Sequence, residues 1–287
     1  MTGPRASFGE RLAAAVAAHG PLCVGIDPHP ALLAEWGLAD DARGLERFAL
    51  TCVDALAGHV AVVKPQSAFF ERFGSAGVAV LERTLAGLRE AGTLSLLDVK
   101  RGDIGTTMAG YAQAYLSDGS PLRADAITVS PYLGYESLRP ALDLAATTGR
   151  GVFVLTLTSN PEGPSVQHAA LDGSTVAASV VAGVARDNAT AAAARRLGSV
   201  GMVVGATVGS AVTDLGLDLA GAAGPLLAPG LGAQGGTPAA LRETFGAALP
   251  QVLGTSSREV LVAGPDVGAL RDAARRAADD LAAALAG

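Results

Sequence analysis

Eight short apolar runs, separated by segments with helical periodicity, constrain the fold of this chain more than any other feature. Buried strands that alternate with helices are typical of a parallel sheet, because each helix carries the chain back to the start of the next strand. The runs occupy residues 22–27, 60–65, 94–99, 125–130, 151–158, 200–205, 225–229 and 251–256. Helical patterns span residues 5–18, 45–56, 69–73, 78–88, 135–146, 174–197, 238–249 and 266–285, and another begins near Asp103.

These units follow one another without a low-complexity linker, which predicts an α/β fold: a single (β/α)8 (TIM) barrel, as one domain over residues 1–287. A doubly wound open sheet is the alternative, and it would need a strand-order switch or a Gly-x-Gly-x-x-Gly turn after the first strand. Residues 25–30 read Gly-Ile-Asp-Pro-His-Pro and contain no such turn. The weakest helical segment is 212–222, which charges and glycines interrupt.

The charge balance and the apolar pattern argue against several classes of partner and location. The formal net charge is −6 and no long basic run occurs, which argues against a nucleic-acid or anionic-membrane surface. No apolar stretch reaches the roughly 20 residues of a membrane span, and the charged N-terminal pattern is unlike a signal peptide. Cys23 and Cys52 are too few for a disulfide scaffold. We therefore expect a cytoplasmic protein.

The third apolar run ends abruptly in charges. Residues two apart on a strand share a face, so Asp98 and Lys100 are predicted to point the same way. Gly102 permits a turn, and Asp103 precedes a helical pattern, which predicts that Asp103 lies in the first turn or at the N-cap. An isolated Asp-x-Lys-x-x-Asp pattern is usually a solvated turn, but these charges follow a strand directly, where α/β proteins bind ligands.

In a barrel the carboxyl ends of all the strands meet at one mouth, so the polar residues that close the runs are predicted to share a cavity. Taken singly, Asp27 could cap a loop and Lys64 could lie on the surface. Lysine and aspartate are rarely buried without a partner, so together they indicate a charge network in a cleft. The predicted mouth residues are Asp27, Lys64, Asp98, Lys100, Ser159, Gln234 and Arg258.

Two neighbouring loops have the composition of a barrel phosphate site. Residues 230–236 after the seventh strand are rich in glycine, which lets backbone N–H groups approach phosphate oxygens. The turn at residues 255–258 after the eighth strand contains Ser257 and Arg258, and arginine can bind a phosphate in a bidentate manner. The pairing of the two loops favours a phosphorylated ligand.

These motifs resemble the orotidine 5′-monophosphate decarboxylase family. The resemblance rests on the sequence Asp-Val-Lys-Arg-Gly-Asp-Ile at residues 98–104 with Thr107, on Lys64, and on Pro-Gly-Leu-Gly-Ala-Gln-Gly-Gly at residues 229–236. The resemblance spans all eight strands. The chain looks most similar to the longer bacterial branch of the family. It implies a carboxy-lyase of pyrimidine biosynthesis that converts orotidine 5′-monophosphate (OMP) to uridine 5′-monophosphate (UMP) without cofactor or metal.

The resemblance also implies roles for the residues that would surround the reacting carbon. Asp27 and Lys64 match residues that hold the ribose hydroxyls, and Lys64 also pairs with the first aspartate of the network. Asp98 matches the aspartate beside the departing carboxylate. Lys100 matches the lysine that protonates C6.

The remaining matches concern the second subunit and the far end of the substrate. Asp103 and Thr107 match residues that the family supplies to the neighbouring subunit's site, which implies a homodimer with shared sites. Ser159 matches a serine that contacts the pyrimidine, and Gln234 an amide that bridges base and phosphate. Arg258 matches the phosphate-binding arginine.

The expected chemistry depends on fixed charge. Loss of CO₂ from C6 leaves a carbanion with no adjacent carbonyl to delocalise it, and the sequence holds no motif for pyridoxal phosphate or thiamine. An ammonium at Lys100, held by Asp98 and Asp103, would be positioned in advance at the developing negative charge.

The sequence leaves two alternatives open. A metal-dependent sugar-phosphate decarboxylase or aldolase could share the Asp-x-Lys-x-x-Asp pattern, although Lys64 would compete with the cation. A catalytically silent protein that binds nucleotide phosphates would keep Arg258 and Gln234 but would have no need of Lys100.

Overall fold

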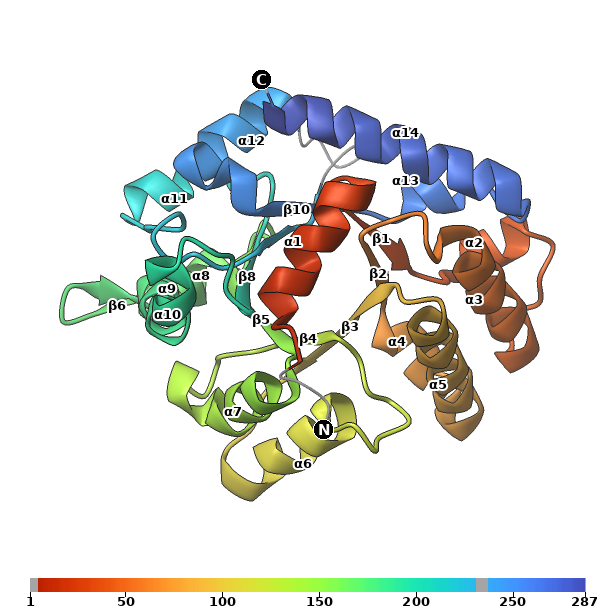
Figure 1. Cartoon of the computed structure of the whole chain (residues 1–287), viewed down its shortest axis with the longest axis horizontal. Helices are drawn as coiled ribbons and strands as arrows, with labels where there is room; N and C mark the ends of the chain where they lie inside the picture. The colour runs from red at the N-terminus through yellow and green to blue at the C-terminus, as the bar shows by residue number, and fades with distance from the viewer. Residues whose placement is uncertain (1–4, 231–236, 287) are drawn as a thin grey trace.

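A closed barrel of parallel strands forms the centre of the computed structural model, which describes residues 5–230 and 237–286 (Figure 1). The strands follow the order β1-β10-β9-β8-β5-β4-β3-β2 around the barrel. Their bounds are β1 (Leu22–Ile26), β2 (Val62–Pro65), β3 (Leu94–Arg101), β4 (Ala126–Val129), β5 (Gly151–Leu157), β8 (Val200–Val204), β9 (Leu226–Ala228) and β10 (Val252–Ser256). The eight predicted runs are the eight barrel strands, so the (β/α)8 prediction is confirmed.

Helices cover the outside of the barrel (Figure 1). The longer ones are α1 (Phe8–His19), α3 (Ala42–Leu56), α5 (Gly74–Glu90), α6 (Gly105–Leu116), α7 (Arg139–Thr148), α9 (Val176–Asp187), α12 (Pro238–Phe245) and α14 (Val267–Ala286). Short helices are α2 (Pro30–Glu35), α4 (Ser67–Glu71), α8 (Pro164–Gln167), α10 (Ala189–Ala193), α11 (Ala211–Asp214) and α13 (Arg258–Leu261), with 3-10 turns at η1 (Tyr135–Leu138) and η3 (Gly246–Gln251). None of the helices among the described residues is long and apolar enough to cross a membrane.

Alternate residues of each strand face two separate cores. In β4, Ala126 belongs to the cluster inside the barrel, whereas Ile127 and Val129 belong to the larger cluster between strands and helices. The interior rows begin with apolar residues such as Cys23, Val62, Leu96 and Leu253. Because the side-chain period of a strand is two, the same rows continue to residues 27, 64, 98 and 257 at the carboxyl ends of the strands.

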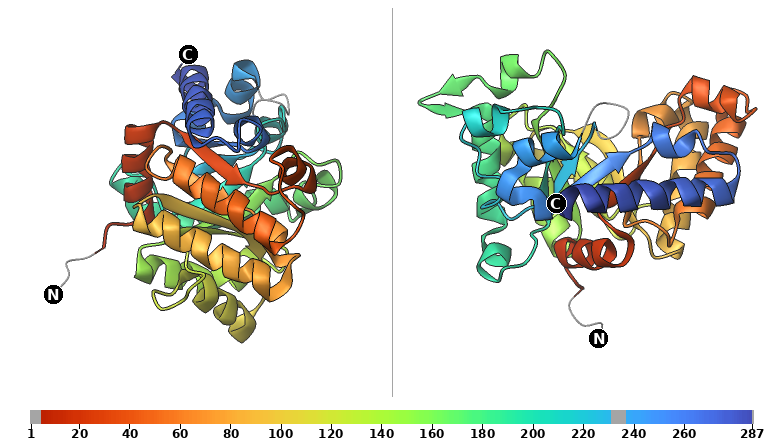
Figure 2. Two further views of the ribbon diagram at one scale, coloured as in Figure 1. Left: turned by 90° about the vertical axis from the view of Figure 1, so that its right-hand side faces the viewer. Right: turned by 90° about the horizontal axis from the view of Figure 1, so that it is seen from above.

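Helix α1 closes the amino-terminal end of the barrel (Figure 2, right). Phe8 and Leu12 belong to the interior cluster, and the Phe8 ring packs edge-on against Phe153 at a centroid distance of 5.9 Å. A Cβ at Gly151 would lie 2.4 Å from the Phe8 ring, so glycine is needed where β5 begins. With this end filled by side chains, ligand access is at the opposite end, where the strands finish.

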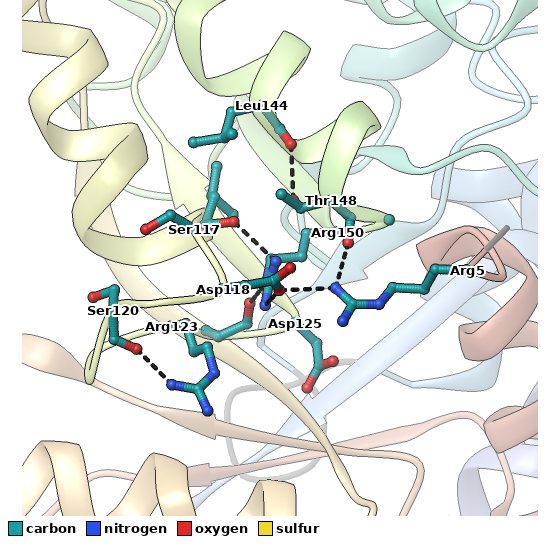
Figure 3. Close-up of polar contacts among 12 residues, drawn as sticks. Arg5, Ser117, Asp118, Ser120, Arg123, Asp125, Leu144, Thr148 and Arg150 are labelled. Carbon is teal, nitrogen blue, oxygen red and sulfur yellow. Dashed lines mark hydrogen bonds and ion pairs between the residues drawn. The ribbon is translucent and has the colours of Figure 1, made fainter. Parts of the chain in front are cut away.

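A polar network joins the segments that enter β4 and β5 to the residues before α1 (Figure 3). Arg150 is 7% exposed and donates to Asp118 Oδ1 and to the carbonyls of Leu116 and Ala124. Arg5 donates to the same Asp118 oxygen at 2.9 Å. Two backbone carbonyls and one carboxylate therefore satisfy the buried guanidinium. These contacts hold together the segments that precede β4 and β5.

Three helix predictions need correction. The pattern at 174–197 forms two helices, α9 and α10, because the buried Asn188 side chain turns to Val200 and Ala222 carbonyls. The pattern at 238–249 becomes α12 followed directly by the turn η3, whose first residue, Gly246, caps α12 at φ 45°. Only the single turn α11 forms within the weak segment near 212–222. A small antiparallel hairpin, β6 (Ala170–Leu171) with β7 (Ser174–Thr175), was not predicted.

Candidate active site

A cavity of about 510 Å³ opens at the carboxyl ends of the barrel strands. Its floor is apolar and comes from the interior rows of β5, β8 and β9, through Leu155, Val203 and Leu227. Its polar wall is formed by residues that close β1, β2, β3, β4 and β10. These wall residues include Asp27, Lys64, Gln66, Asp98, Lys100, Thr128, Ser257 and Arg258. Six residues predicted for the mouth or the phosphate turn thus line one cavity.

The Asp98 carboxylate is the centre of the charge network. Its Oδ1 atom receives Lys100 Nζ at 2.6 Å and the Thr128 hydroxyl at 2.8 Å. Its Oδ2 atom receives Lys64 Nζ at 3.2 Å and Gln66 Nε2 at 2.9 Å. Four donors therefore hold a carboxylate that is only 7% exposed, as a buried charge requires.

The protonation states of this network follow from the balance between burial and charge. Burial alone would raise the pKa of Asp98, but the charges of Lys64 and Lys100 and the hydrogen bonds to the carboxylate lower that pKa to about 2. Burial would likewise lower the pKa of Lys64, yet the negative charges of Asp27 and Asp98 outweigh it and raise the pKa above its usual range. The cavity therefore presents fixed charges at neutral pH.

The backbone at Lys100 is irregular, so strand alternation alone does not explain why its side chain lies beside Asp98. The pairing between β3 and β4 shifts register between Leu97 and Arg101, and Lys100 lies at φ 44°, in the left-handed region. A non-glycine residue there is strained and persists only where its surroundings hold it. The Lys100 backbone N–H donates to Thr128 Oγ1 at 2.9 Å, which is one such contact.

Asp27 offers an unused acceptor at the end of β1, the strand that pairs with β2 and Lys64. It continues the interior row of β1, and its Oδ1 atom is buried without a hydrogen-bond partner among the described residues. Ser257 approaches the same strand, since a Cβ on Gly25 would lie 2.0 Å from Ser257 Oγ. A ligand hydroxyl at this point would satisfy the orphaned carboxylate oxygen.

Arg258 begins α13 at the rim of the cavity, where its side chain is exposed. Within the described part of the chain its guanidinium has no ion pair or hydrogen bond, so its donors remain free for an anion. The predicted partner loop, residues 231–236 with Gln234, lies outside the described residues.

Three predicted site residues do not line the cavity of the single chain. Ser159 is exposed, and its neighbour Thr158 lines the cavity instead. Thr107 is exposed on α6. Asp103 lies before the N-cap, which is Ile104, and its Oδ1 atom accepts the Ile104 N–H at 2.8 Å. The N-cap prediction for Asp103 was therefore off by one residue.

Sequence reasoning missed two residues that contact Asp98. Thr128 lay inside a run classified as apolar, and only its shared parity with Ala126 could have indicated an inward hydroxyl. Gln66 follows the proline that ends β2, and it forms an isolated parallel bridge to Asp98 three residues beyond the last β2–β3 pair, Val63 with Ser95. Within residues 5–230 and 237–286 there is no group of three or more His, Cys, Asp or Glu side chains that could hold a metal ion.

Comparison with known proteins places these features in one family. The family model "Orotidine 5′-phosphate decarboxylase / HUMPS family" matches residues 20–273. A protein of Salinispora arenicola named orotidine 5′-phosphate decarboxylase is 64% identical over 98% of this chain and 99% of its own length. One of Streptomyces coelicolor with the same name is 59% identical over 97% and 98%. A crystal structure from Streptomyces avermitilis, provisionally named for that activity, superposes with a TM-score of 0.93 at 58% identity over 99% of this chain and 98% of its own.

Proposed function

The chain belongs to the orotidine 5′-phosphate decarboxylase / HUMPS family, and from this we propose that it decarboxylates OMP to UMP at the barrel mouth. The observation that carries the proposal is the Asp98 carboxylate held between Lys64 and Lys100 above an apolar floor. The high identity to relatives named for this activity, over nearly their full length, supports the same assignment.

In the proposed reaction the C6–carboxylate bond breaks, CO₂ leaves, and the electron pair stays on C6 of the pyrimidine. Lys100 Nζ then gives a proton to C6, and solvent returns the proton to the amine. Because the Lys100 ammonium is held at 2.6 Å from Asp98 before the substrate arrives, it needs no reorganisation as negative charge develops. No organic cofactor or metal takes part in this scheme.

The remaining site residues are proposed to bind the rest of the nucleotide. The orphaned Asp27 oxygen and Lys64 would hold the ribose hydroxyls, and Ser257 with Arg258 would hold the phosphate. We also propose that Ser159 and Gln234 contact the base. Binding energy from the phosphate end can be used to hold the ring at the charge network.

We further propose that the active form is a homodimer with shared sites. Asp103 and Thr107 lie outside their own cavity, where they are available to a second chain. The apolar side chains Ile104, Tyr132 and Leu133, from the loops after β3 and β4, are 61%, 79% and 53% exposed. Exposed apolar groups of this kind mark interaction sites when they gather together.

Two wider features complete the proposal: a single barrel domain over residues 1–287 and a cytoplasmic location. Both cysteines are free and buried, which suits a reducing compartment.

The test is conversion of OMP to UMP by the purified protein, with and without a metal chelator, and with a ketose phosphate as the competing substrate. We expect turnover of OMP alone and no effect of the chelator. A strict need for a divalent cation, or turnover of the ketose phosphate instead, would contradict the proposal. Binding of UMP without any turnover of OMP would favour a silent nucleotide-binding protein.

A further inference from the structure

One buried hydroxyl connects the two central residues of the charge network. Thr128 lies on β4 in the same inward row as Ala126, and it is 1% exposed. Its Oγ1 atom donates to Asp98 Oδ1 at 2.8 Å and accepts the Lys100 backbone N–H at 2.9 Å. Thr128 thus contacts the side chain of one residue and the main chain of the other.

The directions of these two hydrogen bonds are fixed. A hydroxyl has one proton, and the ionised Asp98 carboxylate can only accept, so the Thr128 proton points to Asp98. The Lys100 N–H can only donate, so it uses a lone pair of the same oxygen. Threonine is also branched at Cβ, which restricts its χ1 rotamers and holds the hydroxyl in place.

The hydrogen bond from the Lys100 N–H to Thr128 lies at the irregular part of β3. Lys100 is at φ 44°, and the β3–β4 register shifts at this point, so the N–H of Lys100 has left the regular ladder. Thr128 provides the acceptor that the ladder no longer supplies. Gln66 also contacts Asp98, but through Oδ2, and among the described residues it makes no hydrogen bond to Lys100.

We infer that Thr128 is a positioning residue for decarboxylation, an inference that rests on the proposed function. Its hydroxyl fixes the left-handed backbone of Lys100 and the Oδ1 atom of Asp98 together, and so sets where Lys100 Nζ stands relative to the reacting carbon. Thr128 need not touch the pyrimidine to do this. A residue that merely filled the barrel interior could be valine, which has nearly the same shape.

The experiment compares Thr128→Val with Thr128→Ser in the full-length protein. Valine removes the hydroxyl and keeps the volume, whereas serine keeps the hydroxyl. Thr156→Val is the matched control, because Thr156 is 2% exposed on the adjacent strand β5 and its hydroxyl, among the described residues, donates to the Val154 carbonyl alone. Measurements are kcat and KM for OMP, the Kd of UMP, and the melting temperature.

We expect Thr128→Val to lower kcat by about 10- to 100-fold, the range for losing a hydrogen bond to a charged group. The Kd of UMP should stay within about threefold, because the affected groups hold the lysine rather than the nucleotide. Thr128→Ser should retain most of the wild-type kcat, and Thr156→Val should leave kcat unchanged even if its melting temperature falls.

Several results would overturn the inference. One is a kcat for Thr128→Val within twofold of the wild type; another is a loss that serine fails to restore. A third is an equal loss of kcat in Thr156→Val, which would indicate general destabilisation. If the valine variant does not fold, Thr128→Ala against Thr128→Ser makes the same comparison. Wild-type protein without activity on OMP would overturn the proposed function itself, whereas an active wild type isolates the inference.

Discussion

At the scale of single residues, Arg258 has the sharpest expected effect on binding. Its guanidinium lines the cavity and carries no ion pair within the described residues. Arg258→Ala should raise the Kd of UMP by about 10- to 100-fold, since a charge-assisted hydrogen bond is worth about 1.5–3 kcal/mol. Calorimetry with UMP and with uridine checks this. Arg275→Ala, in an exposed ion pair on α14, is the control. Equal binding of UMP and uridine by the wild type would contradict a phosphate site.

Asp98 should also make stability depend on pH. Its pKa in the folded protein is about 2, below the ordinary value of 3.8, so the unfolded chain takes up the proton first as pH falls. The stabilisation is therefore complete above about pH 4 and is lost toward pH 2, by about 2 kcal/mol in the free energy of unfolding. Urea unfolding of wild type and Asp98→Asn across this range measures it. Parallel curves would argue against the shift, and the exposed Asp143→Asn is the control.

Which site residues could be found from sequence depends on where they lie along a strand. Asp27, Lys64 and Asp98 stand out because they interrupt apolar runs, and strand parity then places them inward. Thr128 escapes notice because threonine is common inside strands. The left-handed backbone of Lys100 could not be predicted, because it depends on contacts with a residue from another strand.

At the scale of elements, strands were easier to predict than helix boundaries. Barrel strands are buried on both faces and read as continuous apolar runs, which is a strong local signal. The alanine-rich pattern at 174–197 gives no comparable local signal for the break between α9 and α10. The break depends on Asn188, whose amide bonds to carbonyls of two distant segments.

Helix α1 supplies the element-scale prediction. Phe8 is fully buried against Phe153, so Phe8→Ala should lower the free energy of unfolding by about 3–5 kcal/mol. Because α1 lies at the end of the barrel away from the cavity, kcat for OMP at low temperature should be unchanged. Chemical denaturation and kinetics check both parts. Val16→Ala, on the half-buried side of the same helix, should cost less. A large loss of kcat in folded Phe8→Ala would show coupling between the two ends.

At the scale of the whole molecule, the shared-site homodimer can be tested by complementation. Lys100→Ala and Asp103→Ala chains should each be inactive alone. In a mixed dimer with shared sites, one site carries both changes and the other neither, so activity should return in part after subunit exchange. Two differently tagged chains, copurified and assayed, give the measurement. A pure heterodimer without activity would place Asp103 in its own subunit's site or outside the chemistry.

The closure of the barrel by α1 also limits the path by which substrate and products can enter and leave the cavity. Phe8 and Leu12 fill the far end, so among the described residues the cavity opens at the rim that carries Arg258. We therefore expect the substrate to enter, and CO₂ and UMP to leave, through this opening. A nucleotide bound through its phosphate at the rim would narrow the path by which CO₂ leaves the cavity. If the phosphate is bound at the rim as proposed, we expect CO₂, which is small and uncharged, to leave before the nucleotide.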